Sequence, residues 1–288
     1  MSVFVESIGF GLVTSAVLAL ASVGFTLQFA VTNVLNLAYG GVMVVSAYAA
    51  YAINNHGVSI WISALAGIAA GALLSLVLNN FIYTPFQRKG TSPIGMVIVS
   101  LGMTLILVFG TQAIAGPTNV SYSANPGATV TPLGFNLTIE QLVIMALSIA
   151  LMVLVHVLIR YTRLGKAMRA TAANRNLARN CGIRTDRVVT LTWLITGALC
   201  GLAGVVFALD SGTFGATSTD LFLVLILAAV FLGGPGEPYG AMLGALVIGL
   251  ATEISASIVV SDYKDVIAFL ILIAMLAVRP SGLLGAKA

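Results

Sequence analysis

Long stretches without charge recur along the whole of this 288-residue sequence. Charged residues make up 8% of the chain and hydrophobic residues 59%. The mean hydropathy of +1.07 indicates more apolar side chains than the single core of a water-soluble protein could bury. A helix needs about 20 apolar residues to cross a bilayer. Uncharged or nearly uncharged runs occupy 8–28, 31–53, 60–82, 93–116, 139–159, 188–209 and 240–260, and shorter runs occupy 221–234 and 266–278.

These runs are continuous rather than alternating in polarity, which favours membrane helices over a β-barrel. We therefore expect an all-α fold, a polytopic transmembrane helical bundle of about nine membrane segments. The two short runs could be tilted or re-entrant, so the expected range is eight to ten segments. The whole chain, residues 1–288, is expected to form a single transmembrane domain.

Basic residues predict the orientation of these segments, because positively charged loops tend to stay cytoplasmic. With nine alternating spans and 160–187 inside, twelve of the thirteen Lys and Arg residues lie in inner segments, and Lys264 lies outside. The N-terminus is then outside and the C-terminus is cytoplasmic. The inner segments are 83–92, 160–187, 235–239 and 279–288.

Eight of the thirteen basic residues lie between Arg160 and Arg187, where Asp186 is the only acid. A soluble nucleic-acid-binding protein spreads its basic residues over a surface. The concentration of charge in one connection therefore argues against nucleic acid as a partner. It favours a segment that something outside the membrane binds.

Within this basic segment, small or apolar residues recur at helical spacing, which predicts one short amphipathic helix. Gly165 is expected to precede the helix, and Gly182 to end it in a left-handed conformation. One interpretation is a helix resting on anionic membrane lipid. The other is a helix packed in a protein groove, which small side chains suit better than a lipid surface. The recurring residues are Ala170, Ala173, Leu177 and Cys181.

The basic segment also carries a specific resemblance. The run from Thr162 to Ile183, TRLGKAMRATAANRNLARNCGI, resembles the cytoplasmic coupling segment of branched-chain amino acid ABC transporter permeases. Three further blocks resemble the same family in the expected order. They are TNVLNLAYG at 32–40, TGALCGLAG at 196–204 and RPSGLLG at 279–285.

The resemblance implies the transmembrane permease subunit of an ATP-driven importer for branched-chain or other hydrophobic amino acids, in a bacterial inner membrane. Its expected partners are ABC ATPase subunits, a second permease subunit that is identical or related, and a periplasmic substrate-binding protein. Related systems carry amides or urea, which is the alternative substrate class. The residues that the family would dock into the ATPase are Gly165, Lys166, Arg169, Ala170, Asn174, Ala178, Arg179 and Gly182. The chain departs from the family at Asn174-Arg-Asn176, where such permeases often carry a proline.

The residues themselves also indicate that ATP is bound by a separate subunit. A phosphate-binding P-loop requires G-x-x-x-x-G-K-[ST]. The only Gly-Lys pair, Gly165-Lys166, has Arg160 five positions before the glycine and Ala167 after the lysine. We therefore expect ATP to be bound by partner subunits. The sequence also lacks a His-Glu metal motif, a Gly-x-Ser-x-Gly elbow and paired aspartates within the apolar runs, so we expect no cofactor, no metal site and no enzymatic activity in this chain.

A polar stripe predicts the substrate pathway. Gln28, Thr32, Asn36 and Tyr39 follow each other at four- and three-residue steps, so a continuous helix would align them. Buried amides are costly unless they face protein or water. The predicted pathway is lined by Gln28, Thr32, Asn33, Asn36, Tyr39, Gly40 and Gly41. The alternative is that these groups join helices by hydrogen bonds. A second interruption, GGPGEP at 233–238, is also typical of transport pathways.

Two further features leave alternatives open. The outer connection 117–138, with Pro117, Pro126 and Pro132, is either a surface for the binding protein or a solvated connector. Glu253 lies well inside a predicted span, which raises the rival hypothesis of a proton-coupled secondary carrier. Otherwise Glu253 accepts hydrogen bonds from Thr252 or Ser255, or faces a subunit interface.

Overall fold

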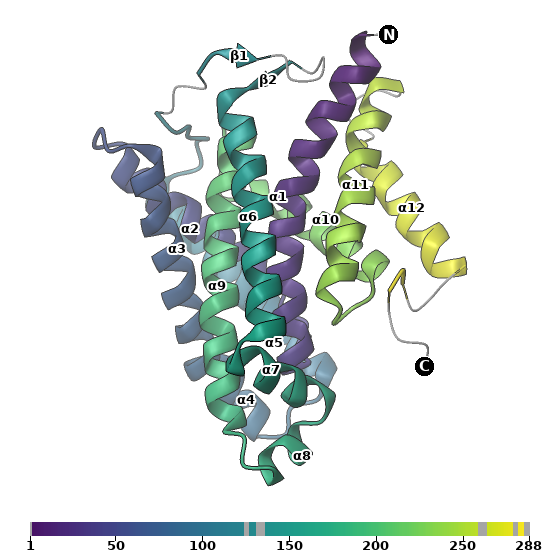
Figure 1. The fold of residues 1–288 in the computed structure, drawn as a ribbon. Coiled ribbons are helices and arrows are strands. Elements are labelled where there is room, and N and C mark those ends of the chain that lie inside the picture. The colour runs from purple at the N-terminus through teal and green to yellow at the C-terminus, as the bar shows by residue number, and fades with distance from the viewer. Residues whose placement is uncertain (1, 124–126, 131–135, 259–263, 279–281, 285–288) are drawn as a thin grey trace. The chain divides into compact units, whose positions relative to one another are not determined.

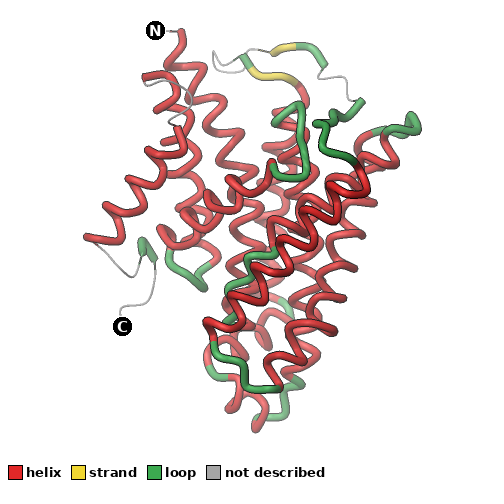
Figure 2. Tube along the Cα trace, turned by 180° about the vertical axis from the view of Figure 1, so that it is seen from behind, coloured by secondary structure: helices red, strands yellow, loops and turns green. Residues whose placement is uncertain are grey.

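The computed structural model describes all residues except 1, 124–126, 131–135, 259–263, 279–281 and 285–288. Helices form most of the described chain, which confirms the all-α prediction (Figure 1). They are α1 (Ser2–Thr32), α2 (Tyr39–Asn54), α3 (Ile60–Val77), the π-helical turn η1 (Leu78–Tyr83), α4 (Thr84–Arg88), α5 (Pro93–Ala115), α6 (Ile139–Tyr161), α7 (Arg163–Ala173), α8 (Arg175–Asn180), α9 (Thr185–Asp210), α10 (Ser218–Gly233), α11 (Pro238–Ile258) and α12 (Lys264–Val278). Two short antiparallel strands, β1 (Thr129–Val130) and β2 (Leu137–Thr138), are yellow in Figure 2.

Each predicted apolar run contains a helix, although residues 33–38 of the run 31–53 are not helical. Six helices in the described residues are long and apolar enough to cross a membrane: α1, α3 continued through η1 and α4, α5, α6, α9 and α11. The chain is therefore a multi-pass integral membrane protein. Helices α2 and α10 have 16 residues and α12 has 15, so each is shorter than the roughly 20 residues of a full span. The number of nine segments, and the sides on which the termini lie, stay predictions.

The chain forms two compact units. The first comprises Met1–Thr26, Ala124–Met152 and Val224–Ala288, and the second comprises Leu27–Ser123 and Val153–Leu223. In the second unit, α4, α7 and α8 lie at the same end (Figure 1). Arg88 at the end of α4, Lys89 after it and the basic residues of the 160–187 segment therefore lie at one end of that unit.

Close helix packing through glycine builds the core of the second unit from α2, α3 and α9. A Cβ atom added to Gly71 would lie 2.5 Å from the carbonyl oxygen of Gly197, and one added to Gly67 would lie 2.5 Å from Val205. Gly204 likewise lies against the carbonyl of Met43. Small residues let membrane helices approach to backbone contact, where van der Waals packing replaces the hydrophobic effect.

The first unit uses the same device between α10 and α11. Gly233 lies against Gly240, and Gly244 lies against the carbonyl of Ala229. The end of α10 is closed by the described part of the RPSGLLG block, because the N–H of Leu283 donates to the carbonyl of Leu232 over 2.8 Å. The rest of that block, 279–281 and 285, lies outside the described residues.

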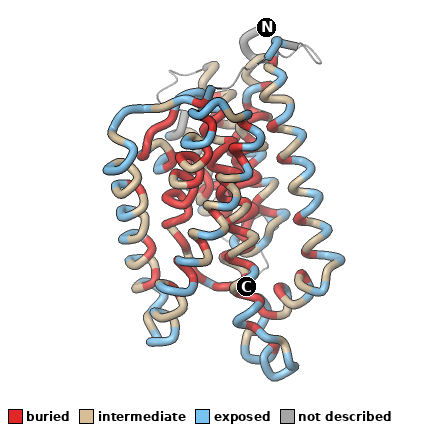
Figure 3. The backbone as a smooth tube through the Cα atoms, turned by 90° about the vertical axis from the view of Figure 1, so that its left-hand side faces the viewer, coloured by how far each residue is buried: buried red, intermediate tan, exposed pale blue. Residues whose placement is uncertain are grey.

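Burial differs between the helices. Most of α1 and α9 is buried, whereas most residues of α5 and α6 are partly or fully exposed. Figure 3 shows helices in which buried and exposed residues alternate, and other helical stretches that are mainly buried. On α5 the exposed side chains are mainly large and aliphatic, as expected for a surface against lipid or another membrane subunit.

Candidate functional site

The polar stripe does not lie on one continuous helix. α1 ends at Thr32, residues 33–38 are not helical, and α2 begins at Tyr39. The helical alignment expected for the stripe is interrupted, because local hydrogen bonds end α1. The hydroxyl of Thr32 donates to the carbonyl of Gln28 over 2.6 Å and accepts from the N–H of Val34 over 3.3 Å. Asn33 then takes a positive φ of 52°, which asparagine tolerates better than most residues.

The break nevertheless brings the predicted side chains together. Nδ2 of Asn36 donates to Oε1 of Gln28 over 3.3 Å, and Oδ1 of Asn36 accepts from the N–H of Ala38 over 3.1 Å. The hydroxyl of Tyr83 donates to the same Oδ1 over 2.5 Å. Gln28 and Asn36 are each 2% exposed, whereas Asn33 is exposed. We call Gln28, Asn36 and Tyr83 the amide cluster.

Sequence reasoning missed Tyr83. It ends η1, and its ring lies 4.8 Å, centroid to centroid, from that of Trp193 in α9. π-Helical turns inside α-helices often mark functional sites. A signal was present, because Asn79 and Asn80 interrupt an otherwise apolar run. Asn79 is buried and accepts from Thr84, at 3.4 Å, inside this turn.

The remaining predicted pathway residues, Tyr39, Gly40 and Gly41, are buried at the start of α2. The carbonyl of Gly40 accepts from the hydroxyl of Thr219 over 3.0 Å, and the carbonyl of Tyr39 lies 3.3 Å from Sγ of Cys200. A Cβ atom on Gly41 would lie 2.9 Å from Leu107. These positions are closely packed in the second unit.

The basic segment contains two helices, α7 and α8, where the sequence predicted one. Asn174 separates the two helices, because its backbone is extended. Its side chain also caps the start of α8, where it accepts a hydrogen bond from the N–H of Leu177 over 2.9 Å. Gly165 does not precede the first helix but lies inside it, and the hydroxyl of Thr162 caps that helix. Gly182 ends α8 with a φ of +84°, as predicted.

The structure separates the predicted coupling residues into exposed and buried ones. Lys166, Arg169, Asn174, Arg179 and Gly182 are exposed, and Ala170 is partly exposed. Gly165 and Ala178 are buried within the chain, where Gly165 packs against the carbonyls of Leu158 and Ile159.

The side chains of the predicted small-residue stripe are largely uncovered. Ala173, Leu177 and Cys181 are all exposed, and Leu177 retains 60% of its accessible surface. The face that α7 and α8 bury within this chain is formed instead by Gly165, Met168, Thr171 and Ala178.

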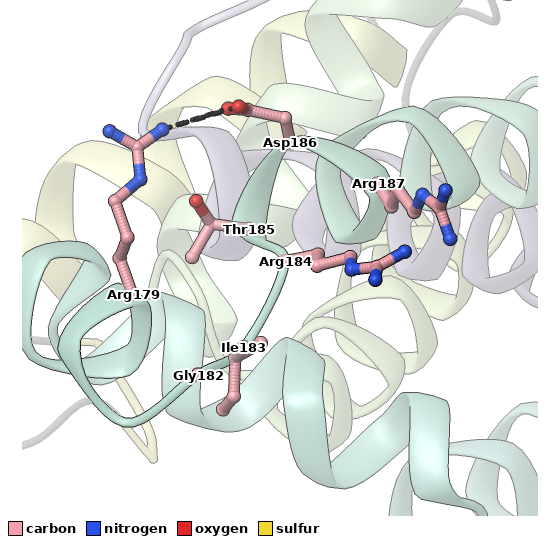
Figure 4. Close-up of a pocket in the computed structure, with 7 residues that line it drawn as sticks. All are labelled: Arg179, Gly182, Ile183, Arg184, Thr185, Asp186 and Arg187. Atoms are coloured by element: carbon pink, nitrogen blue, oxygen red, sulfur yellow. Dashed lines mark hydrogen bonds and ion pairs between the residues drawn. The ribbon is translucent and has the colours of Figure 1, made fainter.

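Asp186 connects α8 with the start of α9. It pairs with Arg175 at 3.3 Å and with Arg179 at 3.2 Å. Its importance went unnoticed in the sequence, although it is the only acid among eight basic residues. Figure 4 shows Arg179 and Asp186 on one side of the loop, and Arg184 and Arg187 pointing together on the other. A hollow of about 490 Å³ lies among these residues, Gly182, Ile183 and Thr185.

Glu253 accepts a hydrogen bond from the hydroxyl of Thr14 in α1 over 3.3 Å. The two donors expected from the sequence, Thr252 and Ser255, donate to backbone carbonyls instead. Ser255 donates to the carbonyl of Thr252, and Thr252 donates to the carbonyl of Gly249. Helical hydroxyls commonly bond the carbonyl one turn back, which removes them as donors to a neighbouring side chain.

The described start of the outer connection, 117–123, is attached to the second unit. The hydroxyl of Tyr122 donates to the carbonyl of Ala47 over 2.9 Å, and burial raises the pKa of Tyr122. The N–H of Ser123 donates to Oδ1 of Asn54 over 2.7 Å. Pro126 and Pro132 lie outside the described residues.

Comparison with known proteins places this architecture in a family. The family described as "Branched-chain amino acid transport system / permease component" matches residues 7–276. The high-affinity branched-chain amino acid transport system permease protein LivH of Escherichia coli (strain K12) is 28% identical over 305 residues, covering 98% of this chain and 96% of LivH.

Two further relatives show the same level of similarity. The high-affinity branched-chain amino acid transport system permease protein BraD of Pseudomonas aeruginosa is 28% identical, covering 96% of this chain and 94% of BraD. The probable branched-chain amino acid transport permease protein LivH of Methanocaldococcus jannaschii is also 28% identical, covering 95% of this chain and 90% of that protein. The chain thus belongs to the family of branched-chain amino acid transport permease components.

Proposed function

We propose that this chain is the transmembrane permease subunit of an ATP-driven importer for branched-chain or other hydrophobic amino acids in a bacterial inner membrane. The observation that carries the proposal is the exposed face of α7 and α8, where Leu177 stands uncovered among basic side chains. A large apolar side chain exposed in a polar segment suits a protein interface. The partner is a separate ABC ATPase subunit.

The exposed residues form the contact with this ATPase. They are Lys166, Arg169, Asn174, Arg179 and Gly182, with the partly exposed Ala170 beside them. Gly165 and Ala178 do not contact the ATPase directly. They are buried, and their packing holds α7 and α8 against the rest of the second unit. Asp186 fixes the position of α8 through its two arginine partners.

The break between α1 and α2 forms part of the substrate pathway. Its lining comprises the amide cluster residues Gln28 and Asn36, with Thr32, Asn33, Tyr39, Gly40 and Gly41. Uncharged amides suit a pathway for a zwitterion, because binding must be weak enough for release. The contact of Tyr83 with Trp193 links this break to α9, which begins beside the coupling helices. A second permease subunit and a periplasmic substrate-binding protein complete the importer.

The test is reconstitution in liposomes with the second permease, the ATPase and the soluble receptor. Uptake of leucine that requires both ATP and the receptor supports the proposal. Uptake driven by an imposed pH gradient without the ATPase would instead support the proton-coupled carrier, and the variant Glu253→Gln would then abolish it. A thermal-shift screen of the receptor against branched-chain amino acids, short amides and urea identifies the substrate class.

A further inference from the structure

The orientation of the Gln28 side-chain amide follows from its neighbours. The N–H of Ala38 can only donate, and it bonds Asn36 over 3.1 Å. That atom of Asn36 must therefore be Oδ1, and the other amide atom is the donor Nδ2. Because Nδ2 needs an acceptor, the Gln28 atom 3.3 Å away is Oε1. The amide nitrogen Nε2 of Gln28 is left outside this chain of bonds.

This nitrogen is a buried donor with unused bonding capacity. Gln28 is 2% exposed, and among the described residues its Nε2 has no hydrogen-bond partner. Leaving a buried donor unmatched weakens folding on the order of tenfold in the equilibrium constant. Such a group indicates either a bound molecule or a functional role.

The location of Gln28 favours a functional role. It lies in the last turn of α1, directly before the non-helical residues 33–38. Broken helices inside membrane proteins are tolerated where the backbone is buried in protein or lines a cavity, and transporters place substrate sites beside them. Through Asn36, the same side chain is connected to Tyr83 of η1.

We propose that Nε2 of Gln28 is a specificity-determining donor that bonds a carboxylate oxygen of the transported amino acid. This inference rests on the proposed function and adds the recognition chemistry. A neutral amide forms a charge-assisted hydrogen bond with a carboxylate, which is about twice as strong as a bond to a neutral carbonyl. It does so without the tight ion pair that a lysine or arginine would form, so the substrate can leave.

The test compares two variants of the complete importer in liposomes. Gln28→Met keeps the length of the side chain and removes the Nε2 donor, together with the Oε1 acceptor that Asn36 uses. Tyr83→Phe removes another hydrogen bond of the amide cluster and leaves the Gln28 donor in place. The saturated rate of ATP-dependent uptake is measured for leucine and for leucinamide, each presented by the loaded receptor.

We expect Gln28→Met to reduce uptake of leucine about tenfold and uptake of leucinamide about threefold, because the charge-assisted bond is the stronger one. Tyr83→Phe should leave the ratio of the two rates unchanged. Equal losses of both substrates in Gln28→Met would overturn the inference and assign the donor to a buried water or to packing. If the unaltered importer fails to take up either compound with ATP, the proposed function itself fails.

Discussion

The hydroxyl of Tyr83 donates a 2.5 Å hydrogen bond to Oδ1 of Asn36, although the two residues are 47 positions apart in the chain. Both side chains are almost fully buried. The bond therefore connects η1 to the break between α1 and α2, and it holds that break in one conformation.

Removal of the Tyr83 hydroxyl is expected to cause a moderate loss of stability. Tyr83→Phe should lower the free energy of unfolding by about 1–2 kcal/mol, because one buried hydrogen bond is lost while Asn36 keeps the Ala38 N–H. Thermal unfolding in detergent measures the effect. The matched control Tyr161→Phe should change little, since Tyr161 is 67% exposed. Equal shifts for the two variants would contradict a structural role for the bond.

Apolar replacements at the break should impair transport. Asn36→Leu and Tyr39→Leu each remove a polar group from the proposed pathway, and Asn36→Leu also leaves Tyr83 without its acceptor. We expect uptake to fall at least tenfold at matched membrane abundance. Asn55→Leu is the control, because Asn55 is exposed and follows the other end of α2. Unchanged uptake in both test variants would remove the break from the pathway.

The close contact between α3 and α9 leaves no room for a side chain at position 71. Gly71→Ala should destabilise the protein by about 1–3 kcal/mol, because the new Cβ meets the backbone of Gly197 and Gly201. Gly102→Ala in α5 should have little effect, since nothing lies within 4 Å of its Cβ position. Unfolding midpoints of the two variants provide the comparison. A Gly71→Ala protein as stable as Gly102→Ala would disprove the close approach.

Replacement of Asp186 should reduce ATP-dependent transport without reducing the stability of the protein. Asp186→Asn breaks exposed ion pairs, which contribute at most about 1 kcal/mol, so the unfolding midpoint should hardly move. ATP-dependent uptake should fall severalfold, because Arg175 and Arg179 no longer position α8. The control Arg163→Gln removes an exposed charge of α7 outside the proposed contact and should retain uptake. Parallel losses in the two variants would contradict a specific role for the ion pairs of Asp186.

The sequence was sufficient to locate the helices and insufficient to locate the breaks within them. Apolar runs of the right length predict helices because a membrane leaves the backbone few alternatives. Residues at three- and four-residue steps, such as Gln28 and Thr32, do not reveal that the helix ends at Thr32. That end depends on the Thr32 hydroxyl and on the distant Tyr83, whose pairing with Asn36 has no local signal.

The coupling helices show the same limit and one missed opportunity. Burial of Gly165 and Ala178 depends on packing that spacing alone cannot predict. The start of α8 at Asn174 could have been predicted, however, because asparagine is among the preferred N-cap residues.

The C-terminal block offers a matched pair of glycines with positive φ. Gly282 has a φ of +77° and its added Cβ would lie 2.6 Å from the nitrogen of Gly234, whereas Gly57 has a φ of +81° with nothing within 4 Å. Gly57→Ala should therefore cost about 1–2 kcal/mol of backbone strain alone. Gly282→Ala should also displace Leu283 and Leu284 from the carbonyls at the end of α10.

Amide hydrogen exchange distinguishes these two effects. In Gly282→Ala the N–H groups of Leu283 and Leu284 should exchange at least tenfold faster, because their acceptors, the carbonyls of Leu232 and Gly233, are no longer within reach. In Gly57→Ala the exchange of the same two amides should stay unchanged. Unaltered protection in Gly282→Ala would mean that the block does not close α10. Faster exchange in both variants would attribute the change to general loosening of the protein.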